Sequence, residues 1–232
     1  IRPYVTYSNR RIPFAIIPNE QWTLANRILL EKPILLWDGG SAICTLTQTK
    51  DFAKGIVGLF LNPKAFQEDF HITTDNTLTW REALEDIGKA LGKKPVIADI
   101  PSTYIAKYMP EYEGVLFGDK GLDRIFDNTK IKEAVPDFCA DTKFEEGIKE
   151  TIQYYKEHPE MQKVNYLWDA KMDSLISKYY KSIKKKDYDK TKLTLKSYNT
   201  KISLKQKLKY MSARNMALYN LLKKTKEIIR RK

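Results

Sequence analysis

Residues 34–60 constrain the fold of this 232-residue chain more than any other segment. The apolar run 34–37 predicts a short buried strand. The turn residues Asp38-Gly39-Gly40-Ser41 then predict a hairpin, whose second strand would be the Thr-, Ile- and Leu-containing segment 43–49. From residue 51 the apolar spacing becomes helical and continues to about residue 60. The order of strand, turn, strand and helix predicts a mixed α/β fold.

Similar signals predict elements on both sides of this segment. Further strands are expected at residues 1–7, 69–73 and 96–100, and further helices at residues 19–31, 79–91, 101–109 and 142–158. Two helix starts carry the capping-box pattern, in which a Thr is followed three residues later by a Glu. These pairs are Thr79 with Glu82 and Thr142 with Glu145.

The charge distribution divides the chain into two parts. The net charge of +12 is the sum of −3 over residues 1–159 and +15 over residues 160–232. The second part has apolar residues at helical spacing from Met161 to Tyr179. A last helix is expected after Ser203, with its apolar side formed by Leu204, Leu208, Met211, Leu218, Leu221 and Leu222. We therefore expect one domain over residues 1–159 and a mainly helical, Lys-rich extension over residues 160–232.

The basic extension leaves three interpretations open. The first interpretation is a helical appendage with a solvated Lys-rich face. It also has the composition of a basic amphipathic segment that lies on an anionic membrane surface. Finally, its seven tyrosines and one tryptophan stand among 21 cationic residues, a combination that suits RNA binding through phosphate contacts and base stacking.

Composition limits the remaining classes of protein. An apolar content of 42% supports a folded core. Cys44 and Cys139 are far apart and lack metal-ligand spacing, which favours a reducing, cytoplasmic setting. His71 and His158 have no ligand-type neighbours, so no metal site is assigned. No apolar run reaches the roughly 20 residues of a membrane span, so any membrane association would be peripheral and through the tail.

Several motifs in the first part resemble those of the extended short-chain dehydrogenase/reductase family, which includes the NAD-dependent sugar-nucleotide epimerases and dehydratases. Asp38-Gly39-Gly40, Thr45-Leu46-Thr47 and Asp51-Phe52-Ala53 are similar to a turn, substrate-reaching strand and helix start of that family. Residues 1–8, IRPYVTYS, are similar to the end of its last dinucleotide-fold strand, with Ser8 in place of the usual Gly. Residues 78–95 and 97–105 are similar to its C-terminal lobe.

The resemblance covers about residues 1–159 and implies the C-terminal portion of a Rossmann-type enzyme. That portion would comprise the last sheet strands and a small α/β substrate lobe, followed by the helical basic tail. The chain begins inside an expected strand, and we therefore expect it to be the downstream part of a longer enzyme. The resemblance implies NAD or NADP as cofactor and a nucleotide-sugar-like small molecule as substrate. A homodimer is compatible with it.

The resemblance also implies roles for particular residues. It places Pro3 and Tyr4 near the cofactor, and Thr6, Tyr7, Thr45 and Thr47 near the substrate. Related proteins hold the nucleotide diphosphate with a basic residue in the loop before an Asp-x-x-Lys motif, which Asp127-x-x-Lys130 matches here. Lys120 and Arg124 are the candidates for this role, because ammonium and guanidinium groups donate well to phosphate oxygens. The alternative is an ordinary solvated loop.

The sequence departs from the family pattern at three places. It has no Gly-x-Gly-x-x-Gly turn after a strand. The family's catalytic Tyr-x-x-x-Lys pair lacks a credible counterpart, since Tyr104 and Lys107 are one residue too close. The Tyr and Lys spacings in the tail are those that any Lys- and Tyr-rich segment contains. Cys44 occupies the strand position at which many family members have a phosphate-binding Arg. The diphosphate would then need another partner, or the substrate is not an ordinary nucleotide sugar.

Two classes of function therefore follow from the sequence. The first is an NAD(P)-dependent epimerase, dehydratase or reductase, for which this chain supplies the substrate lobe. Because this chain lacks the general base, we expect it to be catalytically inactive by itself. The second is a non-catalytic protein that binds an anionic membrane surface or RNA through the basic tail. The sequence leaves open whether the chain is an enzyme.

Overall fold

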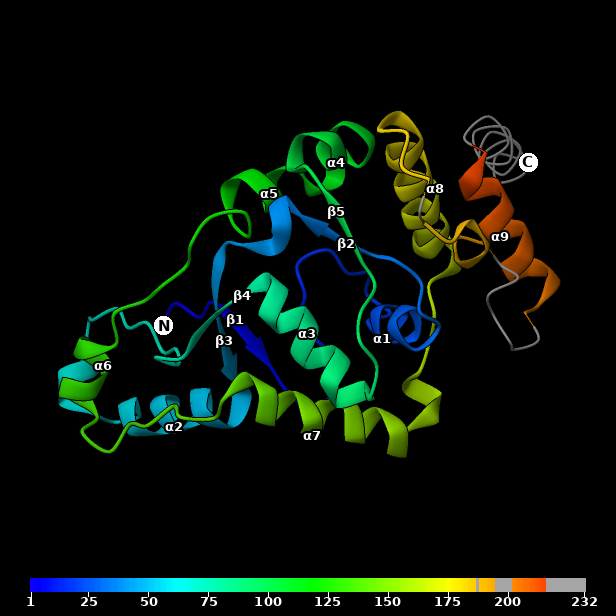
Figure 1. Ribbon diagram of the computed structural model, residues 1–232. Coiled ribbons are helices and arrows are strands. Elements are labelled where there is room, and N and C mark those ends of the chain that lie inside the picture. Colours follow the sequence, from blue (N-terminus) through cyan, green and yellow to red (C-terminus); the bar gives the residue numbers. More distant parts are fainter. Residues whose placement is uncertain (187, 195–201, 216–232) are drawn as a thin grey trace, which may run out of the picture.

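The computed structural model describes residues 1–186, 188–194 and 202–215 and shows a mixed α/β arrangement (Figure 1). Strand β1 (Val5–Tyr7) pairs in parallel with β3 (Ile43–Gln48), which pairs antiparallel with β4 (Thr77–Thr79). A second, two-stranded sheet joins β2 (Ile34–Trp37) and β5 (Ile97–Ile100) in parallel.

Helices surround these two small sheets. The helices of the first part are α1 (Trp22–Leu29), α2 (Thr49–Leu59), α3 (Trp80–Leu91), α4 (Ser102–Tyr108), α5 (Glu113–Gly118), α6 (Thr129–Ala134) and α7 (Phe144–Glu157). The basic extension contributes α8 (Tyr166–Ser182) and α9 (Leu204–Arg214). Figure 1 shows α2 and α6 at one end of the molecule and α8 and α9 at the other, with α3 and α7 side by side between them.

The main core lies where the first residues of α3 meet the strands. Trp37, Trp80 and Phe14 are all buried, and their rings form a cluster with centroids 5.6–5.9 Å apart. Such aromatic clusters contribute both apolar burial and favourable edge-to-face contacts. A separate small core around Phe70 and Ile72 joins α2 to α6.

Several sequence-based predictions are confirmed. The buried strand at 34–37 forms, and the helix that begins near residue 51 is α2. Helix α3 starts with the predicted capping box, in which Thr79 and Glu82 each satisfy the other's backbone N–H group. It ends at Gly92, whose φ of 71° places it in the left-handed region that favours glycine.

The predicted hairpin at residues 38–41 is wrong, because β2 and β3 belong to different sheets. The turn is fixed by contacts outside the segment instead. The Asp38 carboxylate accepts hydrogen bonds from the backbone N–H and the hydroxyl of Ser102, and the Gly39 N–H donates to Asp99 at 2.7 Å. These contacts hold the turn against β5 and α4, so that the chain leaves one sheet and enters the other.

Two further predictions are also wrong. Residues 69–73 form a single isolated bridge between Arg2 and His71 rather than a strand. The expected capping box at Thr142 does not form, because α7 begins one residue too late for it, with Lys143 at the N-cap position. The backbone N–H of Thr142 donates to the carboxylate of Asp51 instead.

The first helix of the basic extension packs against the main core. Trp168, Met172 and Ile176 on α8 are buried there, and α9 packs on α8. The division of the chain at residues 159 and 160 stays a prediction about its organisation. The predicted last helix forms as α9 with a Ser203–Gln206 capping box, whereas the predicted positions Leu218, Leu221 and Leu222 lie outside the described residues.

A cluster of four buried charges joins α8 to the first part of the chain. Arg27 on α1 and Lys32 after it both contact Asp169 and Asp173 on α8, and all four side chains are at most 1% exposed. The Lys32 Nζ atom lies 2.6 Å from Asp169 and 2.7 Å from Asp173. We call these four residues the buried charge cluster. Within the described residues, no helix has the length and apolar character needed to cross a membrane.

Asp51 gives a pH-dependent prediction for the junction between α2 and α7. Its carboxylate is 1% exposed and accepts hydrogen bonds from Lys54 at 2.8 Å and from the Thr142 N–H at 3.0 Å. Burial alone would raise the pKa of this carboxyl, but the hydrogen bonds from Lys54 and Thr142 outweigh it and lower the pKa. The folded state therefore favours the ionised form.

We expect Asp51→Asn to lower the free energy of unfolding at neutral pH by about 1.5–3 kcal/mol, the usual range for a charge-assisted hydrogen bond. This contribution is complete above the usual aspartate pKa of 3.8 and is lost as the pH falls through the lower folded-state value. Urea unfolding over a falling pH series should show the two proteins converging. Glu150→Gln, in an exposed pair with Lys50, is the control; a pH-independent loss in Asp51→Asn would contradict the argument.

Candidate functional site

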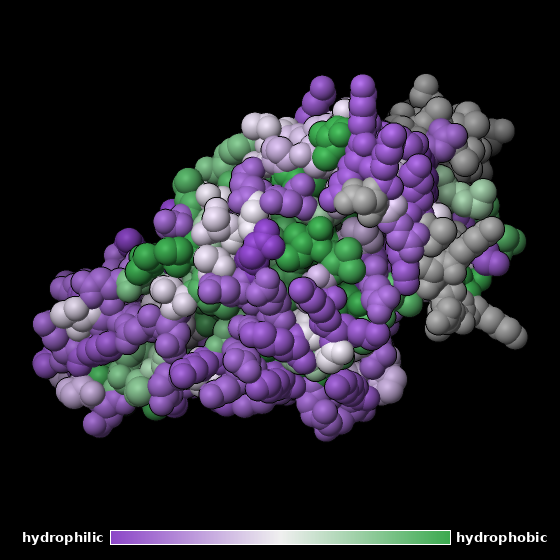
Figure 2. Space-filling view, viewed as in Figure 1, coloured by the Kyte–Doolittle hydropathy of each residue, from purple (hydrophilic) through white to green (hydrophobic). Residues whose placement is uncertain are grey.

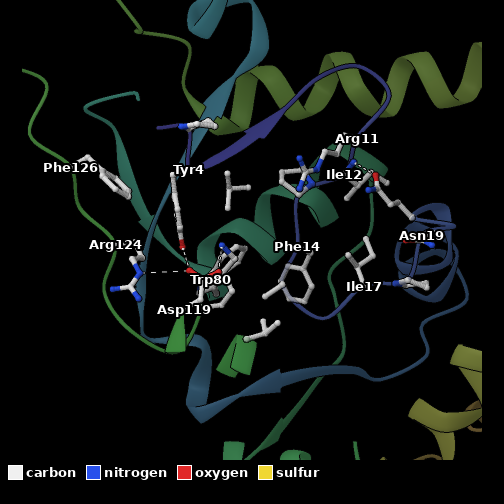
Figure 3. A pocket seen from close by; sticks show the side chains of 18 of the residues that line it. Tyr4, Arg11, Ile12, Phe14, Ile17, Asn19, Trp80, Asp119, Arg124 and Phe126 are labelled. Atoms are coloured by element: carbon white, nitrogen blue, oxygen red, sulfur yellow. Dashed lines mark hydrogen bonds and ion pairs between the residues drawn. The ribbon is translucent and has the colours of Figure 1, made fainter. Parts of the chain in front are cut away.

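A cavity of about 860 Å³ lies between the N-terminal segment, the start of α3 and the loop after α5 (Figure 3). Its walls come from four stretches far apart in the sequence, which are residues 3–5, residues 11–21, Trp80 with His71, and residues 115–126. Strand β1 positions the first stretch beside β3, and the buried aromatic cluster supports the floor near Phe14 and Trp80. The cavity is therefore a product of the tertiary fold rather than of any one segment.

One edge of the cavity carries two cations that share one carboxylate. The Lys120 Nζ atom lies 2.8 Å from Asp119, and the Arg124 Nε atom lies 3.6 Å from the same carboxylate. The Arg124 guanidinium also donates to the carbonyl oxygen of Gly118 at 2.7 Å. Asp119 can neutralise only one of the two cations, so this edge has an excess of positive charge.

Tyr4, which directly precedes β1, completes this arrangement. Its hydroxyl donates to Asp119 at 3.1 Å, and the Lys120 Nζ atom lies 4.0 Å from the centre of its ring. Burial, followed by the nearby charge of Asp119, raises the pKa of Tyr4. Tyr4 therefore stays protonated near neutral pH and acts as a hydrogen-bond donor rather than a base. Figure 3 shows Asp119 between the Tyr4 hydroxyl and the Arg124 guanidinium.

Three hydrogen bonds hold the loop with the two cations against the first half of β3. The Arg124 N–H donates to the Ile43 carbonyl at 2.9 Å, and the Thr45 hydroxyl donates to the Arg124 carbonyl at 2.7 Å. The Asp123 carboxylate accepts from the Ile43 N–H at 2.8 Å. These contacts lie on both sides of Cys44, so Arg124 is placed next to the strand position that Cys44 occupies.

Cys44 itself does not offer a charge to a ligand. Its side chain is fully buried, and burial raises the pKa of the thiol to about 12.

The loop that carries the two cations needs a glycine at position 121, because a Cβ atom at Gly121 would lie 1.9 Å from the carbonyl oxygen of Leu116. The loop can therefore fold back over α5 only with Gly directly after Lys120.

The remaining wall of the cavity is aromatic and basic. The Phe126 ring packs against both Tyr4 and His71, with centroids 5.0 Å apart in each case. Arg11 is exposed and lies on the side of the cavity opposite Arg124 in Figure 3. The lining thus includes three cationic side chains and one carboxylate beside planar apolar rings. Such a lining suits an anionic ligand with a flat or apolar part.

The structure brings four of the eight predicted site residues together on this cavity. Pro3, Tyr4, Lys120 and Arg124 all line it. The other four lie outside the lining: Thr6 is half-buried on β1, and Tyr7, Thr45 and Thr47 are buried. The Thr45 hydroxyl serves the loop as described, and the Thr47 hydroxyl accepts from the Thr74 N–H at 3.1 Å. The assigned roles of all eight residues stay predictions.

Sequence reasoning did not identify Asp119, Arg11 or Phe126 as site residues. Asp119 directly precedes Lys120, so its position beside a candidate phosphate ligand was the available signal. Arg11 and Phe126 gave no such signal, because their proximity depends on how β1 and the loop after α5 come together. Trp80 is buried in the core and also forms part of the cavity floor.

The described residues do not by themselves fit a dinucleotide cofactor. A pyrophosphate site needs a glycine turn that leads from a strand into a helix N-terminus. In the described part of the chain the glycine turn at residues 38–41 leads into strand β3, and the turns that lead into α2 and α4 contain no glycine. Nor do three or more His, Cys, Asp or Glu side chains gather there as metal ligands.

Comparison with solved structures identifies the fold. An epimerase from Methanothermobacter thermautotrophicus superposes with a TM-score of 0.54 and 14% identity, over 69% of this chain and 44% of that one. UDP-glucuronic acid 4-epimerase from Bacillus cereus, solved with NAD, gives a TM-score of 0.49 and 16% identity over 67% and 42% of the two chains. UDP-glucose 4-epimerase from Thermus thermophilus gives 0.46 and 18% over 68% and 46%.

Of these three proteins, the Methanothermobacter epimerase has a TM-score above 0.5, and the fold is assigned from it. No family model matches the sequence, and a search of the curated proteins found no match. This chain spans less than half the length of each of the three solved proteins. It therefore shares the fold of part of the Methanothermobacter epimerase.

Proposed function

We propose that residues 1–159 are the C-terminal, substrate-binding part of an NAD(P)-dependent epimerase, dehydratase or reductase that acts on a nucleotide-sugar-like substrate. In this proposal the cavity beside Tyr4 receives the substrate. Lys120 and Arg124 bind its diphosphate, and the ring of Phe126 packs against a flat part of the ligand. Pro3 and Tyr4 form the wall on the side of the cofactor.

The observation that carries this proposal is the pair of cations at the edge of the cavity. Lys120 and Arg124 converge on one carboxylate, so a diphosphate can take up the charge that Asp119 leaves uncompensated. Arg124 can offer two parallel N–H groups to phosphate oxygens, whereas Lys120 supplies a point charge. Lys120 is only 14% exposed, so its charge is less screened by water than that of a surface lysine.

The loop also explains how a phosphate could be bound although position 44 holds a neutral cysteine. Sequence comparison with the family leads to the expectation of an arginine in that strand, and Cys44 cannot replace its guanidinium. Because Arg124 is hydrogen-bonded beside Ile43 and Thr45, its side chain enters the cavity next to that position. We infer that Arg124 takes over the phosphate contact from the loop rather than from the strand.

The other predicted substrate residues have a supporting part in this proposal. Thr45 fixes the loop by its hydrogen bond to Arg124, and Thr47 fixes residue 74 beside the same strand. Tyr7 packs under α7 at Gly147, and Thr6 faces away from the buried side of β1. Lys120 lies beside Tyr4, but burial and the charge of Asp119 raise the pKa of Tyr4, so it is not poised as a base. The proposed contribution of the cavity residues is therefore binding and orientation.

Calorimetric titration of this chain with nucleoside diphosphates tests the proposal. UDP and GDP should both bind, and uridine and guanosine should bind much more weakly, because the proposed contacts are to the diphosphate. Raising the salt concentration should weaken the binding of the diphosphates. Equal binding of nucleosides and nucleoside diphosphates, or binding of neither, would remove the cavity as a nucleotide site.

A further inference from the structure

Helix α9 has two faces with different surroundings. Tyr210 and Ala213 are buried against Ala170 of α8. Leu204, Leu208 and Met211 point away from that contact and are 73%, 53% and 56% exposed. Their spacing of four and three residues places them in one row along the helix. The helix therefore presents a row of three large apolar side chains to its surroundings.

Cationic residues flank this row on both sides. At 100° per residue, Lys205 and Lys209 lie along one side of it and Lys207 along the other. All three lysines are exposed, and residues 202–215 contain no acidic residue. Figure 2 shows hydrophobic surface next to hydrophilic surface at the edge of the molecule where α9 lies. An apolar row between lysines is the pattern of helices that lie in the headgroup region of an anionic membrane.

The tyrosines of the basic extension argue against nucleic acid as the occupant of this surface. Binding of single-stranded RNA uses exposed aromatic rings on which bases stack. The described tyrosines of the extension are all buried or half-buried, and they are Tyr166, Tyr179, Tyr180, Tyr188 and Tyr210. Among the described residues of the extension, the large exposed apolar side chains are aliphatic. They include Ile183, which is 51% exposed and directly precedes three exposed lysines.

We propose that the apolar row of α9 docks on the surface of an anionic phospholipid membrane. Leu204, Leu208 and Met211 enter the boundary between headgroups and acyl chains, and the flanking lysines pair with lipid phosphate and carboxylate groups. The occupant is the lipid surface itself, because the charge on both sides of the row is positive and the row is aliphatic. This proposal is independent of what the cavity binds.

Co-sedimentation of the full chain with phosphatidylcholine vesicles, with and without phosphatidylserine, tests the proposal. We expect the chain to sediment with the phosphatidylserine-containing vesicles and to be released as salt is added. Combined Leu204→Ser, Leu208→Ser and Met211→Ser should weaken this binding about tenfold or more, since most of the inserted apolar surface is lost. Combined Lys205→Glu, Lys207→Glu and Lys209→Glu should weaken it similarly, by removing the electrostatic attraction.

A matched control removes three exposed apolar residues from the other end of the molecule. Phe60→Ser, Leu61→Ser and Phe66→Ser alter side chains that are 76%, 89% and 78% exposed near the end of α2, and vesicle binding should be unchanged. Circular dichroism confirms that each variant is folded. Failure to sediment with phosphatidylserine vesicles, or undiminished binding by the α9 apolar variant, would overturn the proposal. Binding to single-stranded RNA but not to vesicles, lost in the lysine variant, would overturn it in favour of nucleic acid.

Discussion

Asp173→Asn should lower the free energy of unfolding by about 3–5 kcal/mol, the usual cost of removing one partner from a buried ion pair. Asp173 lies in the buried charge cluster, where it contacts Arg27 at 2.9 Å and Lys32 at 2.7 Å. The variant leaves two buried cations facing one carboxylate. Burial, and secondly the charge of Arg27, already lowers the pKa of Lys32, so loss of an acidic partner makes its charge still less favourable.

Urea unfolding of a surface control, of a double variant and of its two single variants separates this effect from the loss of a surface charge. Lys171 is on the same helix as Asp173 and forms an exposed pair with Glu111, and Lys171→Met should cost no more than about 1 kcal/mol. The double variant Lys32→Met with Asp173→Leu removes one charge of each sign and should be less destabilising than the sum of its single variants. A loss below about 1 kcal/mol in Asp173→Asn would mean that the cluster does not anchor α8 as described.

Combined Lys120→Ala and Arg124→Ala should weaken binding of UDP and GDP by about 100-fold or more. Each side chain is expected to give a charge-assisted hydrogen bond to the diphosphate, worth about 1.5–3 kcal/mol, and 1.4 kcal/mol corresponds to tenfold. Arg124→Lys should recover only part of the loss, because an ammonium group cannot make the paired contact of a guanidinium. Calorimetric titration of the variants measures each effect.

Lys130→Ala is the matched control for these variants. Lys130 is half-exposed, pairs with Glu68 at 2.7 Å and does not line the cavity. Its loss removes one positive charge, as the single variants Lys120→Ala and Arg124→Ala each do, but at a different place, so nucleotide affinity should change little. If Lys130→Ala weakened binding as much as Lys120→Ala and Arg124→Ala do, a general attraction of the anion to a basic protein would explain the binding better than the cavity.

Local signals predicted a large part of the fold because they depend on near neighbours in the sequence. The capping box of α3 involves residues within one turn of each other, and it forms as predicted. The turn at residues 38–41 has equally strong local signals, but the choice of pairing partner is not local. Asp99 and Ser102, about 60 residues away, hold that turn, and no pattern within the turn indicates them.

The candidate site shows the same limit. Family resemblance directed attention to Lys120 and Arg124, which the fold does place on one cavity. It could not indicate Arg11 or Phe126, whose places depend on the meeting of distant segments. Arg27 and Lys32 are a stronger example, because charged residues on an amphipathic helix and its end are expected to be solvated. They are buried because α8 packs against α1 and its aspartates pair with them, a contact that no local pattern indicates.

We propose that nucleotides bind in the cavity lined by Tyr4, Lys120 and Arg124. A titration of the isotope-labelled chain with UDP, followed by NMR chemical shifts, tests this location directly. We predict that the largest shifts occur in residues 3–5 and 115–126, with little change in α9. Largest shifts in α8 and α9, or none in the loop of Lys120 and Arg124, would contradict the claim.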